Sequence, residues 1–177
     1  YKDVAHIHQL NGTPNVNNTP QNNDQEKVTR TAKVIGFKNC TTGAGATTLI
    51  YMLMKVLSEK DYVVALEVNK NDFGFFNEKN MYSVNANNLE AAINRFGTAN
   101  LILVDLNNAN SEICDDVIYL MEPSTIKLNK MMLINKDIFD KLYGKKIVLN
   151  KSLLTEKDVS DFEYESHARV LYNMPPL

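Results

Sequence analysis

From residue 32 onward, short apolar runs alternate with segments whose apolar residues repeat at helical spacing. Residues 62–68 (YVVALEV) and 100–106 (NLILVDL) are predominantly apolar, as strands covered on both faces require. Between these two runs, Leu89, Ala92, Ile93 and Phe96 repeat at i, i+3, i+4 and i+7, which is typical of a helix. This alternation predicts an α/β fold with a doubly wound, mostly parallel sheet flanked by helices.

The remaining segments fit the same scheme. Gly97 stands where a helix C-cap is expected, and Thr155 with Asp158 resembles a capping box at a helix start. The residues at 126–142 have patchy helical periodicity. Further strands are expected at 32–37, 117–121, 146–149 and 169–172, and further helices at 47–57 and 155–165.

The chain of 177 residues is long enough for one domain, which we expect at 31–177 with a C-terminus that is truncated. Residues 11–30 are rich in Asn, Pro and Gln and predict a flexible linker. Residues 1–10 would then be the tail of an upstream domain, and a start at Tyr1 predicts further sequence before it. His6 and His8 share a strand face there, but two histidines favour a plain surface strand over a metal site.

Composition excludes several classes of function. The net charge of −2 and the pI of about 5.9 argue against a nucleic-acid partner. Cys40 and Cys114 are far apart, which argues against a disulfide scaffold or zinc site and favours a reducing compartment. Because the sequence has neither a membrane-length apolar run nor a signal peptide, we expect a cytoplasmic protein.

A glycine-bearing loop connects the first predicted strand to the first predicted helix. Gly43 and Gly45 precede Thr47 and Thr48, so backbone N–H groups and a helix N-terminus can converge on phosphate groups. The alternative is that the glycines serve only a tight turn and that the threonines are ordinary residues of the helix start.

This loop resembles that of the MinD/ParA family of P-loop ATPases, whose pattern is K-G-G-x-G-K-T-[ST]. Gly43 and Gly45 match glycines of the pattern, and Thr47 and Thr48 match its hydroxyl pair. Both lysines are absent, because Thr41 stands at the family's signature lysine and Ala46 at the Walker lysine. Two further residues stand where a glycine is expected. Thr42 replaces a glycine of this pattern, and Cys40 replaces the first glycine of the general Walker pattern G-x-x-x-x-G-K-[ST].

The resemblance extends over about 32–177 and implies roles for other residues. Asp105 matches the Walker-B aspartate, which would hold Mg²⁺ together with Thr47. Asn150 matches the asparagine at the adenine edge, and Pro175 the proline beside the base. Asn69 stands where the family has its catalytic aspartate, so Glu67, two residues earlier, is expected to be a solvated edge charge. Asp105 could instead cap a loop, and Asn150 could be a turn residue.

The leading functional hypothesis is a non-catalytic pseudo-ATPase that acts as a scaffold or localisation factor. The degenerate loop and linker look like the TadZ/CpaE branch, in which a receiver-like domain precedes the ATPase-like domain and the protein helps to place pilus assembly machinery. Such a role implies protein partners, with a homodimer as one option. Because Thr41 carries no charge, such a dimer would lack the bridging lysine of the family. The role also implies a place at the inner membrane face or a cell pole, through partners or missing segments. ATP or ADP with Mg²⁺ is expected only if nucleotide binds, and no cofactor is the favoured expectation.

Two other functions stand as alternatives to this hypothesis. The first is an ATP-binding switch with weak or no hydrolysis. The second is DNA partition, against which the acidic balance argues, although Lys145 and Lys146 form a small basic spot. An aromatic cluster is expected to be core or a lid over the sheet, with a partner-binding patch as the alternative; it comprises Phe73, Phe75, Phe76, Met81 and Tyr82.

Overall fold

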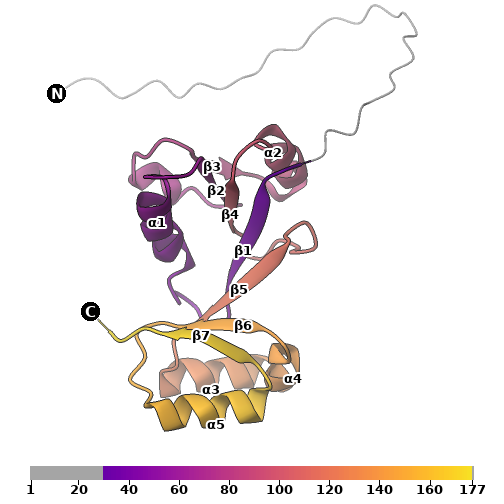
Figure 1. Cartoon of the computed structure of the whole chain (residues 1–177). Helices are drawn as coiled ribbons and strands as arrows, with labels where there is room; N and C mark the ends of the chain where they lie inside the picture. Colours follow the sequence, from indigo (N-terminus) through magenta and orange to yellow (C-terminus); the bar gives the residue numbers. More distant parts are fainter. Residues whose placement is uncertain (1–29, 177) are drawn as a thin grey trace, which may run out of the picture.

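The computed structural model describes residues 30–176 (Figure 1). The predicted tail at 1–10 and all of the predicted linker except Arg30 lie outside these residues. The strands are β1 (Lys33–Asn39), β2 (Val63–Val68), β3 (Met81–Val84), β4 (Leu101–Asp105), β5 (Asp116–Met121), β6 (Lys146–Leu149) and β7 (Arg169–Asn173). The helices are α1 (Ala46–Leu57), α2 (Leu89–Arg95), α3 (Thr125–Ile134), α4 (Ile138–Leu142) and α5 (Glu156–Ser166), with short 3₁₀ turns η1 (Phe73–Phe75) and η2 (Ala86–Asn88).

All seven strands form one parallel sheet in the order β3-β2-β4-β1-β5-β6-β7. The central strand β1 pairs with β4 on one side and with β5 on the other. The sheet therefore extends to both sides of β1, with β4 inserted between β1 and β2, which confirms the predicted doubly wound α/β fold. In such a sheet the crevice at the carboxyl end of the central strand is the usual place for a ligand.

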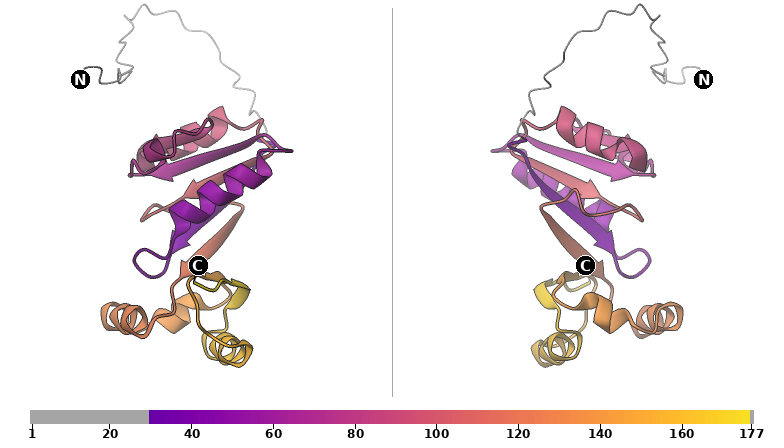
Figure 2. Two further views of the ribbon diagram at one scale, coloured as in Figure 1. Left: turned by 90° about the vertical axis from the view of Figure 1, so that its left-hand side faces the viewer. Right: turned by 90° about the vertical axis from the view of Figure 1, so that its right-hand side faces the viewer.

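Helices cover both faces of the sheet because side chains alternate along each strand. Phe37 of β1 packs with Ile50 of α1 on one face, whereas Val34 packs with Ile93 of α2 on the other. Figure 2 shows α1 in front of the sheet in its left view and behind it in its right view. A third cluster packs α3, α4 and α5 against β5 and β6, and includes Met121, Met131, Leu142, Ile147 and Leu149.

The structure differs from the sequence prediction at two places. The patchy helix at 126–142 is interrupted, because Asn135 adopts an extended conformation (φ −143°, ψ 93°) and ends α3 before α4 begins. The sequence also did not predict β3, which is only four residues long and pairs with β2 at the edge of the sheet. Elsewhere, Thr155 and Asp158 form the predicted capping box at the start of α5.

The aromatic cluster is divided between core and surface. Phe73 and Met81 are buried in the core beneath α1, and Phe76 stacks on Tyr51 of α1 with ring centroids 4.3 Å apart. Phe75, by contrast, is 88% exposed. The expectation of core packing therefore holds for three of the five residues. Phe75 lies outside the core, and so does Tyr82, which is 40% exposed and stacks on Phe96.

Within residues 30–176, no helix combines the length and apolar character needed to cross a bilayer. The same residues contain no cluster of three or more His, Cys, Asp or Glu side chains arranged to hold a metal ion.

Candidate functional site

The loop between β1 and α1 opens at the carboxyl end of the central strand. Gly43 (φ 69°) and Gly45 (φ 100°) both have positive φ, a conformation that side chains disfavour. The Ala44 N–H donates to the Thr41 carbonyl at 3.2 Å, which tightens the loop before the helix starts. A pocket of about 540 Å³ lies over the loop, and its walls also include Lys70, Asp72, Asn107 and Asn108.

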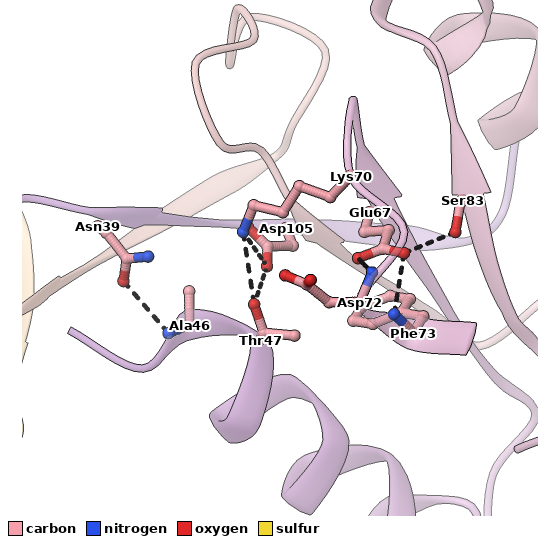
Figure 3. Close-up of polar contacts among 9 residues, drawn as sticks. All are labelled: Asn39, Ala46, Thr47, Glu67, Lys70, Asp72, Phe73, Ser83 and Asp105. Carbon is pink, nitrogen blue, oxygen red and sulfur yellow. Dashed lines mark hydrogen bonds and ion pairs between the residues drawn. The ribbon is translucent and has the colours of Figure 1, made fainter. Parts of the chain in front are cut away.

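A hydroxyl and an ammonium group from the wall of this pocket form a cluster with a buried carboxylate (Figure 3). Thr47 Oγ1 donates to Asp105 Oδ2 at 2.7 Å. Lys70 Nζ lies 3.0 Å from the same carboxylate oxygen and 3.4 Å from Thr47 Oγ1. Asp105 is only 1% exposed and the Lys70 side chain 20%. The cluster thus joins the start of α1, the end of β4 and the segment after β2.

Glu67 was expected to be a solvated edge charge, and that expectation is wrong. Its side chain is fully buried on β2. It accepts hydrogen bonds from the N–H groups of Asp72 (3.0 Å) and Phe73 (2.9 Å) and from Ser83 Oγ (2.6 Å). A buried carboxylate is tolerated where donors surround it. These bonds fold the segment after β2 so that Lys70 and Asp72 line the pocket.

Three polar side chains hold the loop from below and from the side. Asn39 Oδ1 accepts the Ala46 N–H at 3.2 Å. Thr41 is buried, and its Oγ1 accepts the N–H of Glu122 at 2.8 Å. Asn150 Nδ2 donates to the Ala44 carbonyl at 2.8 Å. Thr41 is therefore anchored to the end of β5, and Ala46 has a protein partner for its backbone donor.

Lys127 adds positive charge beside the loop. Its Nζ would lie 3.9 Å from a Cβ atom at Gly43, and it forms an ion pair with Glu122 at 2.6 Å. This hydrogen bond with Lys127, together with the nearby positive charges, lowers the pKa of Glu122 below its usual value.

The structure gathers most of the residues that the sequence singled out. Thr48 lines the pocket together with Gly43, Gly45, Ala46 and Thr47, and Asp105 joins it through Thr47. Asn150 follows β6 and contacts the loop, whereas Pro175 is exposed beyond β7 and is not among the pocket residues. Asn69 Oδ1 accepts the Ala86 N–H, so its side chain bonds to the start of η2. The nucleotide and metal roles of these residues stay predictions.

Sequence reasoning missed Lys70 and Asp72. Figure 3 shows the Asp72 carboxylate pointing toward Thr47 and Asp105. One available signal was their position just after an apolar strand, since the carboxyl ends of parallel strands meet at one edge of the sheet.

Cys40 lines the same pocket, yet its thiol should be unreactive. Burial raises the pKa of Cys40 to about 12, despite an opposing effect of the Lys38 charge. Only the thiolate attacks a disulfide reagent, so its fraction at neutral pH falls about 10³-fold relative to an unfolded thiol. We expect the Cys114→Ser variant to react with Ellman's reagent very slowly when folded and rapidly in denaturant. Rapid labelling of the folded variant would contradict this assignment.

No protein-family model and no curated protein matches the sequence. Solved structures do match the fold. A ParA family ATPase from Chlorobium tepidum TLS has a TM-score of 0.57 at 12% identity, over 84% of this chain and 85% of that one. An ATP complex of McdA from Cyanothece has a TM-score of 0.55 at 13% identity, over 81% and 83% of the two chains. The MinD cell division protein of Aquifex aeolicus has a TM-score of 0.53 at 15% identity, over 81% and 82%.

These structures match the fold described above over most of both chains. The chain therefore has the fold of the MinD/ParA P-loop ATPases. At identities of 12–15% the likeness concerns the fold alone.

Proposed function

We propose that this domain is a non-catalytic relative of the MinD/ParA ATPases that acts through protein contacts as a scaffold or localisation factor. One observation carries the proposal: Ala46 and Thr41 stand at the two lysine positions of the family's loop. Neither residue has a charged side chain that could contact a phosphate. In phosphoryl transfer, cations neutralise the charge that spreads over the transferred group.

The energetic consequence is large. Loss of a single preorganised contact to a transition state costs about 3–4 kcal/mol, or roughly 10²–10³ in rate. The chain lacks both lysines, and Asn69, at the position of the catalytic aspartate, bonds instead to the start of η2. Even with effects that do not add fully, hydrolysis should be negligible.

An apolar stripe on α3 supports a role in protein contacts. Ile126, Leu133 and Ile134 are 69%, 81% and 87% exposed, and the first two lie seven residues apart on one helix face. Exposed apolar side chains that gather on one face are common at interaction sites. We propose pilus or secretion machinery as the setting, on the basis of the resemblance to the TadZ/CpaE branch.

A second candidate is a nucleotide-dependent switch with weak or no hydrolysis. The observation that favours it is the pocket of about 540 Å³, which retains the positive-φ glycines and has Lys70 as a cation on its wall. Under this alternative, nucleotide would bind and change the association of the domain.

Addition of Mg-ATP to the purified chain should separate the two candidates. We expect no turnover above background, no rise in melting temperature and no change in sedimentation, because the loop supplies no lysine to the phosphates. A melting temperature that rises by several degrees with Mg-ATP, and does not rise in Thr47→Ala, would favour the switch. Turnover that is lost in Asp105→Asn would refute the non-catalytic assignment.

A further inference from the structure

Asp105 has a counter-charge within the chain itself. Its carboxylate is 1% exposed, and Lys70 Nζ lies 3.0 Å from Oδ2. A carboxylate buried in this way needs a cation or several donors close by, since desolvation of an unpaired charge is costly. Lys70 supplies the charge, and the Thr47 hydroxyl supplies a further donor at 2.7 Å.

The fold family implies Mg²⁺ at this place, with the hydroxyl at the start of α1 and the aspartate at the end of β4 beside it. Mg²⁺ requires oxygen ligands at about 2.0–2.1 Å in near-octahedral geometry. In this chain an ammonium group already contacts both oxygens, at 3.4 Å from Thr47 Oγ1 and 3.0 Å from Asp105 Oδ2. A divalent cation in the same space would meet direct repulsion from Lys70. The residues as arranged do not fit Mg²⁺.

Lys70 is also held in this position by the fold. Glu67 accepts hydrogen bonds from the N–H groups of Asp72 and Phe73, which lie two and three residues after Lys70 in the chain. Phe73 is buried in the core beneath α1. The segment is therefore fixed on both the polar and the apolar side, which places the Lys70 backbone near the pocket. The Lys70 side chain is in turn oriented by its ion pair with Asp105.

We propose that Lys70 permanently replaces a divalent cation in this pocket, so that the domain neither binds nor responds to Mg²⁺. Removal of the ammonium group leaves the Thr47 hydroxyl and the Asp105 carboxylate without their cation. The Asp72 carboxylate lines the same pocket and points toward them (Figure 3). A variant without the Lys70 charge thereby acquires a divalent metal site that the natural chain lacks.

The test uses the Lys70→Met variant, which keeps an unbranched apolar stem and removes the charge. Thermal unfolding is measured in EDTA and in about 10 mM Mg²⁺ or Mn²⁺. We expect no metal-dependent shift for the natural chain and a rise of about 2–5 °C for Lys70→Met, because a ligand that binds only the folded state stabilises it. Direct titration of Mn²⁺, followed by its electron paramagnetic resonance signal, should show one bound ion in the variant alone.

Two further variants isolate the position of the charge. Lys127→Met removes a lysine beside the same loop without touching Thr47 or Asp105. Like the natural chain, it should show no metal-dependent shift in melting temperature. Lys70→Met combined with Asp105→Asn removes both charges and should lose the metal response while regaining stability in EDTA. If Lys70→Met does not fold in EDTA, refolding in Mn²⁺ should restore the folded state of this variant.

Three results would overturn the proposal: specific Mn²⁺ binding by the natural chain, a metal response of equal size in Lys127→Met, or no response and no metal rescue of Lys70→Met. None of these measurements uses nucleotide. Failure of the metal proposal is therefore distinguishable from failure of the non-catalytic assignment, which rests on turnover of Mg-ATP.

Discussion

Gly45→Ala should lower the free energy of unfolding by about 2–4 kcal/mol. Gly45 has φ 100°, a backbone conformation that alanine adopts only with strain. In addition, a Cβ atom there would lie 2.6 Å from Asn150 Nδ2, the group that holds the Ala44 carbonyl. The substitution therefore strains the backbone and displaces the side chain that supports the loop. Urea denaturation followed by circular dichroism measures the loss.

The two contributions can be separated by matched variants. Gly144→Ala introduces a Cβ atom at a positive φ of 67°, which lies in the left-handed region that alanine can adopt, and with nothing within 4 Å, so it should cost only about 1 kcal/mol. In an Asn150→Ala background the clash is absent, and Gly45→Ala should then cost less than it does in the natural background. Equal losses for Gly45→Ala and Gly144→Ala in the natural background would show that Asn150 exerts no steric effect.

Glu67→Ala should destabilise the domain by about 3 kcal/mol, because hydrogen bonds to a charged group contribute about 1.5–3 kcal/mol each and are not fully additive. The substitution removes the acceptor for the N–H groups of Asp72 and Phe73 and for Ser83 Oγ. It also leaves a void on β2, whose six residues are all buried. Denaturant unfolding measures the total loss, and amide hydrogen exchange at Asp72 and Phe73 shows whether the segment after β2 has loosened.

Glu67→Gln keeps the shape and one acceptor oxygen, and should cost less than Glu67→Ala. Glu59 is exposed after α1, so Glu59→Ala removes the same formal charge with an effect within about 0.5 kcal/mol. Unchanged exchange rates at Asp72 and Phe73 in Glu67→Ala would mean that the buried carboxylate does not organise this segment.

Much of the fold was predictable because the buried strands are apolar along most of their length. The run at 62–68 contains β2, and the run at 100–106 contains β4, which lies beside it. The edge strand β3 was not predictable in the same way, since its burial differs from residue to residue and its sequence MYSV is short. The interruption between α3 and α4 depends on the backbone of Asn135, for which helical periodicity gives no warning.

The candidate site was predictable only in part. Gly45 and Thr47 follow from a loop between a strand and a helix, which is a local feature of the chain. Lys70 and Glu67 are different, because their positions depend on contacts with residues distant in the sequence. Lys70 meets Asp105 only after β2 and β4 have paired, and Glu67 is satisfied partly by Ser83 of β3. An isolated glutamate in an apolar run gives no indication that its donors arrive later in the chain.

The pairing of β1 has a consequence for biosynthesis. Ile35 pairs with Leu103 on one side and with Asp116 on the other, so both neighbours of the central strand leave the ribosome long after β1 itself. Until β5 has emerged, the backbone donors and acceptors of β1 lack their final partners, and this stage is when a nascent chain is most exposed to aggregation or to capture by chaperones. Ribosome-bound chains stalled before Asp116 should therefore remain protease-sensitive, and protection should appear only once β5 has cleared the exit tunnel.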